Sequence, residues 1–327
     1  MRAARGARRS LAVAAALSVL VAAAVRLPSL RARGAPAAAA SGAAPHVPAA
    51  AAGVLAAPLA AMVAAQLVAP GAALWAGLVV ALSPIHALAS RQAAPEALLV
   101  SSLLIALRLA AALDRHGHRA LAVALGLAVG GLAASGVAAF AAVGILLPVF
   151  PATRPDRRAA AALVAGVALA VVATAASLGL ARSPLDYGEI PQWVPPTTLL
   201  GVWRCAGASF TRVVGLEYQL VVSHARYVLP LTALFVALML WGAVRLRARP
   251  RGLLVAGALF PFVLGATLAV IEGHVAPLQA NRLLAAMPFV ALLTAAGLAS
   301  LKGTRAWAGA AFVFGTLAAF LALALAR

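Results

Sequence analysis

The residues best suited to chemistry lie together in the segment SPIHALASRQAAPEALL, residues 83–99. This segment sets His86, Arg91 and Glu96 in a short polar hinge between two apolar runs. Ionisable groups are costly at a membrane boundary unless they face water, a partner or a ligand. Because the chain has only seven carboxylates, we interpret Glu96 as a candidate acid that binds a metal or orients a substrate. Arg91 would then contact a phosphate.

The same residues also have a simpler interpretation. Pro84 disrupts the preceding helix, and Pro95 favours a new helix start. A carboxylate in the first turn, where Glu96 lies, is stabilised by the helix dipole. An arginine at this depth can extend its charged end to lipid headgroups. The residues alone leave both interpretations open.

The composition indicates a helical membrane protein. Of the 327 residues, 65% are hydrophobic and only 10% are charged, and the mean hydropathy is +1.03. Long Ala, Leu and Val runs occur in place of the short alternating strands of a membrane barrel. These values exclude an ordinary soluble globular protein. They predict an all-α polytopic integral membrane protein, with residues 1–327 forming one transmembrane domain.

We expect about eleven transmembrane helices, with boundaries accurate to a few residues. In chain order they cover residues 10–26, 49–69, 71–89, 96–113, 119–134, 136–150, 159–181, 226–244, 252–271, 283–301 and 305–325. The first is interpreted as an uncleaved span. A signal peptide cleaved near residues 38–40 is the alternative.

The basic loops predict the orientation, since Lys and Arg favour the cytoplasmic side. A cytoplasmic N-terminus puts most of the basic residues into alternate loops on that side. We therefore expect the cytoplasmic (inner) membrane of the cell envelope, with the polar chemistry outside. The first extracytoplasmic loop, residues 27–48, contains no carboxylate. The larger extracytoplasmic loop, residues 182–225, is expected to place a short amphipathic helix on the membrane surface.

Charge, cysteine content and missing motifs narrow the function. The net charge of +19 does not indicate a nucleic-acid partner, because the basic residues form small clusters without interleaved aromatics. The single cysteine, Cys205, excludes an intrachain disulfide and a cysteine-based metal site. The sequence has no Walker loop, dinucleotide fingerprint, HExxH or GxSxG motif. Soluble nucleotide chemistry therefore has no support.

A second polar cluster lies near the end of the predicted ninth span. Glu272 and His274 are candidates for an acid or a metal ligand there, and Arg282 for a phosphate contact. One Glu and one His do not define a metal site, which usually needs three or more protein ligands. An ordinary interfacial loop is the alternative.

Several segments resemble the GT-C-type polytopic glycosyltransferases, a group that includes protein mannosyltransferases and the aminoarabinose and arabinosyl transferases. Ser-Pro, Ser-Arg and Pro-acid-x-Leu-Leu patterns recur there between the third and fourth spans. They stand here as SP at 83–84, SR at 90–91 and PEALL at 95–99. RLP at 26–28 resembles the start of the family's first loop, and QANRLLAAMP at 279–288 resembles the opening of a late span.

The resemblance implies a GT-C-like fold and the transfer of a sugar from a polyprenyl-phosphate donor to an acceptor at the extracytoplasmic face. A first-loop aspartate would act as base on the acceptor hydroxyl. Further acids would hold a divalent cation, and basic residues would hold the lipid phosphate. The chain departs from this pattern because its first loop has no Asp or Glu, which leaves His46 as the proton acceptor available there. The catalytic candidates are Glu96 and His46; the substrate-binding candidates are Arg91, Arg282, His86, Glu272 and His274.

Two other functions stay open. The acid-free first loop favours a non-catalytic relative that binds lipid or a partner protein. A transporter of a lipid or solute is less favoured, because no clear internal repeat is present. The predicted partners are the polyprenyl-phosphate sugar and membrane lipids. The sequence does not define the sugar, the acceptor, the metal ligands or a protein partner.

Overall fold

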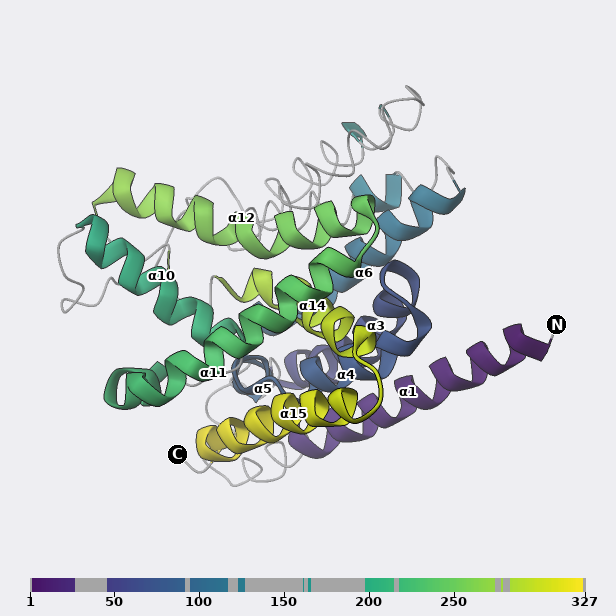
Figure 1. Ribbon diagram of the computed structural model, residues 1–327. Coiled ribbons are helices and arrows are strands. Elements are labelled where there is room, and N and C mark those ends of the chain that lie inside the picture. Colours follow the sequence, from purple (N-terminus) through teal and green to yellow (C-terminus); the bar gives the residue numbers. More distant parts are fainter. Residues whose placement is uncertain are drawn as a thin grey trace, which may run out of the picture.

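The chain is helical throughout the part that the computed structural model describes, which comprises residues 2–26, 46–91, 95–116, 123–126, 161, 164–165, 198–214, 218–273, 278 and 283–325. This confirms the all-α prediction. The helices are α1 (Arg2–Arg26), α3 (His46–Leu67), α4 (Ala73–Leu82), α5 (Pro84–Arg91), α6 (Pro95–His116), α10 (Leu199–Val214), α11 (Tyr218–Arg245), α12 (Ala248–Glu272), α14 (Met287–Ser300) and α15 (Thr304–Leu325), with 3-10 turns η2 (Pro70–Ala72) and η4 (Leu284–Ala286) (Figure 1). The helices predicted over 119–134, 136–150 and 159–181 fall outside the described residues except for short pieces.

Three of the described helices are long and apolar enough to cross a membrane, in the segments Ala50–Leu67, Pro250–Ile271 and Thr304–Leu323. A fourth candidate is a bent pair, Pro70–Leu82 and Pro84–Ser90, whose axes meet at 58°. The apolar segments of α1, α6, α11 and α14 are shorter. These lengths support a membrane protein, and the number of eleven spans stays a prediction.

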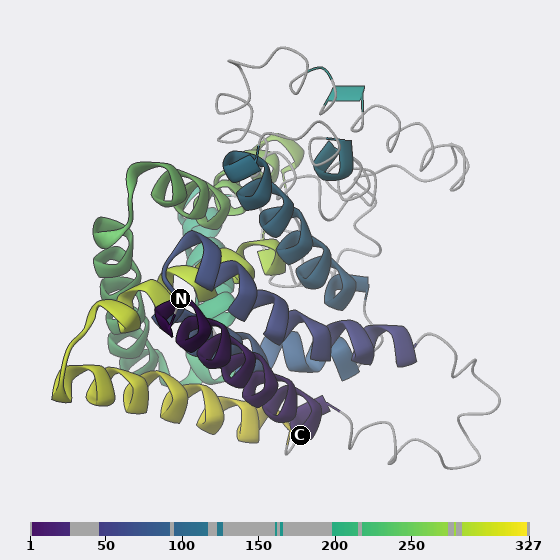
Figure 2. The same ribbon diagram turned by 90° about the vertical axis from the view of Figure 1, so that its right-hand side faces the viewer.

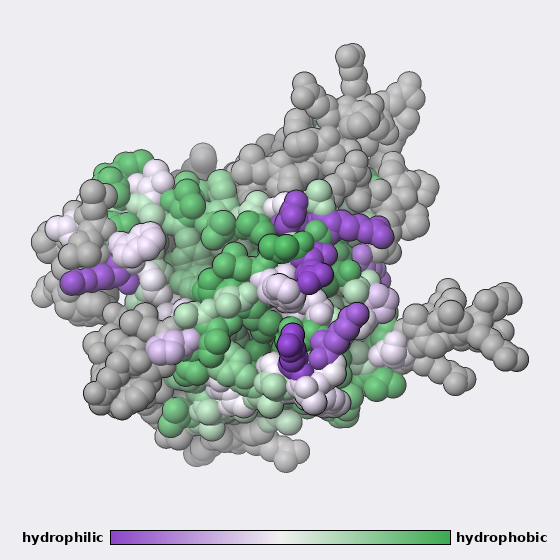
Figure 3. All heavy atoms as spheres, in the orientation of Figure 1, coloured by the Kyte–Doolittle hydropathy of each residue, from purple (hydrophilic) through white to green (hydrophobic). Residues whose placement is uncertain are grey.

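Much of the apolar surface of α12 and α15 points outward. Only 33% and 28% of the residues in their membrane-capable segments are buried. Ile271 is 73% exposed and Trp307 is 75% exposed. A broad apolar surface covers the face seen in Figure 3. Such a surface is a liability in water, whereas in a bilayer it contacts acyl chains.

Helix α14 forms the centre of the bundle. Every residue from Met287 to Leu298 is buried, and the helix contacts α4, α10, α11, α12 and α15. The backbone of α11 approaches it closely at Gly242, where an added Cβ would lie 2.6 Å from the backbone nitrogen of Gly297. Small residues at crossings allow this close packing of apolar helices.

Helices α1, α3 and α4 form a second packed group. Figure 2 shows α1 and α3 running side by side, and both contact α4. Gly77 of α4 lies against Ser18 of α1, with an added Cβ only 2.7 Å from the serine Cβ. The predicted first span is therefore packed into the bundle.

The helix predicted over 71–89 is divided in two. It breaks at Ser83, which is extended with φ −61° and ψ 116°. Pro84 lacks a backbone N–H and clashes with a preceding helical turn, yet it fits the first turn of a new helix. Residues 84–91 consequently form α5 rather than a polar hinge, and His86 is helical.

The segment predicted to contain an amphipathic helix does so in α10. Trp203 is 79% exposed, while Val202, Val213 and Val214 are buried. Ser209 donates a hydrogen bond to the carbonyl of Leu278 on the packed side. The position of this helix on a membrane surface stays a prediction.

Candidate functional site

Two buried ionisable side chains, Arg26 and His86, lie together at the bend between α4 and α5. Neither has exposed surface. Nη2 of Arg26 lies 3.0 Å from Nδ1 of His86. A guanidinium only donates hydrogen bonds. Nδ1 of His86 is therefore the acceptor, which assigns the imidazole proton to Nε2.

Arg26 also caps the broken end of α4. Its Nη1 donates to the carbonyl of Ala81 at 2.9 Å, and its Nη2 donates to the carbonyl of Val80 at 3.1 Å. The last carbonyls of a helix have no acceptor role within that helix. A planar guanidinium offers five donors in a fixed fork, so one side chain can serve both carbonyls and His86. The buried charge is thereby surrounded by acceptors, as burial requires.

Ser90 and Gly53 complete this cluster. Ser90 is 1% exposed, and its Oγ donates to the backbone carbonyl of His86 at 2.7 Å. A Cβ added at Gly53 of α3 would lie 2.7 Å from the Cβ of Ser90 and 3.0 Å from Cδ of Arg26. Glycine is therefore required at this position by lack of space. We call Arg26, Gly53, His86 and Ser90 the bend cluster.

The bend cluster supports the segment that carries two further candidates. Arg91 is the last residue of α5, and Glu96 lies in the first turn of α6. The connecting residues 92–94 and both side chains lie outside the described part. Because Arg26 and Ser90 hold α5, they orient the end of the helix from which Arg91 projects. In this arrangement Arg26, His86 and Ser90 are positioning residues.

The second predicted cluster flanks elements that pack against α6. Glu272 is the last residue of α12, and Gly273 follows with φ +72°, a left-handed conformation that favours glycine. His274 and Arg282 lie outside the described residues, as does the side chain of Glu272. The turn η4 begins two residues after Arg282 and contacts both α6 and α12. The structure thus brings the chain next to Arg282 to the helix that contains Glu96.

The remaining catalytic candidate, His46, is the first residue of α3. Its side chain is not among the described ones. Helix α3 contacts α5, so the start of the packed part of the chain after the first loop belongs to the same group of helices.

Three members of the bend cluster were not chosen from the sequence as site residues. Arg26 was noted only within the RLP pattern, and Ser90 only within the Ser-Arg pattern. An arginine after an apolar run is typical of an interfacial residue, so the sequence carries little signal that its side chain is buried. The partner, His86, lies 60 residues further on, a separation that helical periodicity cannot reveal.

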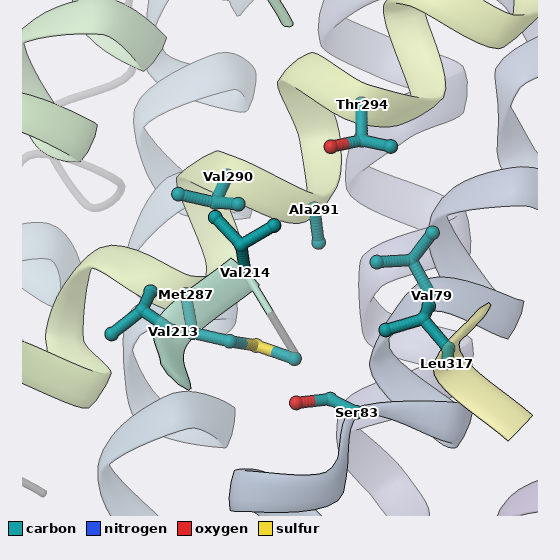
Figure 4. A pocket seen from close by; sticks show the side chains of 9 residues that line it. All are labelled: Val79, Ser83, Val213, Val214, Met287, Val290, Ala291, Thr294 and Leu317. Carbon is teal, nitrogen blue, oxygen red and sulfur yellow. The ribbon is translucent and has the colours of Figure 1, made fainter. Parts of the chain in front are cut away.

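A small cavity lies on another side of the α4–α5 bend. It is lined by Val79, Ser83, Val213, Val214, Met287, Val290, Ala291, Thr294 and Leu317 (Figure 4). It has about 10 Å³ of room for the centres of water molecules, which is about the need of one water. The hydroxyls of Ser83 and Thr294 have no hydrogen-bond partner among the described residues. The cavity is too small for a sugar or an isoprenoid unit.

Within the described residues, no three His, Cys, Asp or Glu side chains gather where they could hold a metal ion. The acids that we predicted to bind a cation have side chains outside that part of the chain, so cation binding stays a prediction. No protein-family model matches this chain, and no curated protein matches it significantly.

Proposed function

We propose that the chain is a GT-C-like membrane glycosyltransferase that moves a sugar from a polyprenyl-phosphate donor to an acceptor at the extracytoplasmic face. The contact between Arg26 and His86 carries the proposal. The two residues belong to separate segments, RLP at 26–28 and residues 83–99, each of which resembles the family in its own right. They are 60 residues apart in the chain, and their side chains lie 3.0 Å apart in the structure.

The third family-like segment, residues 279–288, supports the same proposal. Its described end forms η4 and the start of α14, with Leu284 and Met287 buried. Both η4 and α14 contact α6, the helix that carries the PEALL pattern. All three segments therefore meet on the helices α5 and α6.

Each candidate has a defined role in the proposed reaction. Glu96, or His46 in its place, takes the proton from the acceptor hydroxyl. The hydroxyl oxygen then bonds to the anomeric carbon as the bond from that carbon to the phosphate oxygen breaks. Arg91 and Arg282 stabilise the negative charge of the departing polyprenyl phosphate by charge-assisted hydrogen bonds. His86 acts through the position of α5 rather than on the substrate.

The finer topology belongs to the same proposal. About eleven spans with a cytoplasmic N-terminus put the start of α6 and the loop before α14 on the extracytoplasmic side. Glu272 and His274 then border the donor site, where they would hold either the substrate or a divalent cation.

A non-catalytic relative is the second candidate, on one specific observation. Residues 27–48, which correspond to the family's first loop, contain no Asp or Glu. Such a protein would keep the donor site and the packing around α5 without performing the transfer.

Native mass spectrometry of the full chain, purified gently from its own membranes, tests the proposal. A polyprenyl-phosphate sugar should accompany the wild type and the control Arg204→Ala, which changes an exposed arginine on α10. Arg282→Ala should lose this lipid, and Glu96→Gln should keep it without transferring the sugar. Bulk phospholipid alone on the wild type, or full turnover by Glu96→Gln, would contradict the proposal. Donor binding by a wild type that forms no product with any acceptor or metal would identify the non-catalytic relative.

A further inference from the structure

Two turns of the bundle carry exposed cations. The α11–α12 turn and the α14–α15 turn contain Arg245, Arg247, Arg251, Lys302 and Arg305, all of which are exposed. We call these five residues the basic rim. No carboxylate occurs in the sequence between Glu217 and Glu272, or after Glu272. Neither turn therefore carries an acid of its own to neutralise its cations.

The two turns lie near one another because α11 crosses both α14 and α15. Gly242, three residues before Arg245, packs against the backbone of Gly297, five residues before Lys302. Further along, Phe235 of α11 stacks against Phe312 of α15 with ring centroids 5.4 Å apart. Hydrophilic side chains gather over both turns on the same face in Figure 3, within largely apolar surroundings.

Exposed apolar and aromatic side chains adjoin the basic rim. Val244, next to Arg245, is 69% exposed, and Trp307, two residues after Arg305, is also exposed. The guanidinium of Arg245 lies over the ring of Trp241, 4.5 Å from its centroid. A cation held on an aromatic ring is attracted by the ring's electron density and kept at one height. Tryptophan favours the headgroup level of a bilayer.

We propose that the basic rim binds the headgroup of an anionic phospholipid, whose acyl chains lie along the exposed apolar faces of α11 and α15. The cations supply charge complementary to the phosphate, and the adjoining surface accommodates the chains. Each Lys or Arg near an anionic bilayer strengthens binding about fivefold. A nucleic acid or a free phosphate would match the charge and leave the apolar surroundings without a role. The inference rests on the chain being a membrane protein and not on glycosyl transfer.

The test uses the purified full chain in detergent, titrated with phosphatidylglycerol or with phosphatidylcholine of the same acyl chains. Native mass spectrometry should show the wild type retaining phosphatidylglycerol at least tenfold better, with the preference falling as salt is raised. The triple variant Arg245→Gln/Arg247→Gln/Lys302→Gln should weaken phosphatidylglycerol binding about 100-fold if the fivefold contributions combine. Arg204→Gln is the matched control, because Arg204 is an exposed arginine beside exposed Trp203 but belongs to another helix.

Three results would overturn the proposal: equal retention of the two lipids by the wild type, an equal loss in Arg204→Gln, or complete displacement of phosphatidylglycerol by millimolar inorganic phosphate. If the triple variant does not fold, the wild-type lipid preference and the single variant Arg245→Gln decide the question. Arg245→Gln should lose about fivefold in affinity for phosphatidylglycerol and leave phosphatidylcholine binding unchanged.

Discussion

Replacing Arg26 by methionine should strongly destabilise the bundle. Methionine keeps a long unbranched side chain of similar reach but has no donor. The carbonyls of Val80 and Ala81 and Nδ1 of His86 would lose the donor that the guanidinium provides. All three acceptors belong to the buried bend between α4 and α5.

The size of the effect follows from the number of acceptors affected. A buried acceptor that loses its donor costs about 1–3 kcal/mol, so three would cost about 3–9 kcal/mol. The variant also removes the cost of burying the guanidinium, which favours the lower part of this range. Breaking a buried charged contact by removing one partner costs about 3–5 kcal/mol in other proteins. We therefore expect a loss of about 3–5 kcal/mol in the free energy of unfolding.

The single cysteine provides the assay. Cys205 is partly buried, so a thiol-reactive fluorophore should report thermal unfolding of the purified full chain. At about 2 °C per kcal/mol, the low end for long chains, Arg26→Met should melt about 6–10 °C below the wild type. Arg26→Lys keeps the charge and should fall between the two, because an ammonium cannot form the planar fork. Arg204→Met, an exposed arginine on α10, should change the melting temperature by about 1 °C at most.

One result would refute this reasoning. If Arg26→Met melted within about 2 °C of the wild type, water or relaxed backbone would be satisfying the carbonyls, and the bend cluster would not hold α5. A comparable loss in Arg204→Met would show that the assay responds to charge rather than to the buried contact.

Three further outcomes are expected. Gly53→Ala should lower stability by about 1–3 kcal/mol from overpacking, while Gly252→Ala, where nothing lies within 4 Å of the added Cβ, should be neutral or raise it by up to about 1 kcal/mol; equal melting temperatures for the two variants would contradict the packing of α3. Gly297→Leu should prevent α14 from packing against α11, since even a Cβ there meets the side chain of Leu238 at 2.8 Å, and unchanged gel-filtration behaviour and melting would count against that contact. Burial raises the pKa of the Cys205 thiol, so iodoacetamide should react slowly at neutral pH and faster as pH rises, whereas a midpoint at the ordinary cysteine value of about 8.5 would show that the thiol is not desolvated.

The helical class and most boundaries could be predicted, because they depend on local composition. The helix predicted over 305–325 is α15, Thr304–Leu325, and that over 252–271 lies within α12, Ala248–Glu272. Apolar runs closed by arginine, glycine or proline are enough to define such elements. The break at Ser83 had a local signal in Pro84, although the helical state of the residues after it did not.

The bend cluster could be predicted only in part, because its determinants are tertiary. His86 was selected as a polar residue in an apolar setting, on the expectation that it would face water or a ligand. Its actual neighbour is Arg26 from α1, and the space for both is created by Gly53 of α3. A charge that satisfies carbonyls 54 and 55 residues away leaves no periodic trace in the sequence. Buried arginines of this kind are recognised from the acceptors around them.

The capping of α4 by Arg26 has a consequence for synthesis. The arginine leaves the ribosome before the carbonyls of Val80 and Ala81 exist, because they follow it by 54 and 55 residues. Until α4 arrives, the charged end of α1 must be held by water or headgroups. The first helix can therefore reach its final depth only after the fourth has been made. Insertion of the early chain and closure of the bend are thus a single late event, rather than two steps in the order of translation.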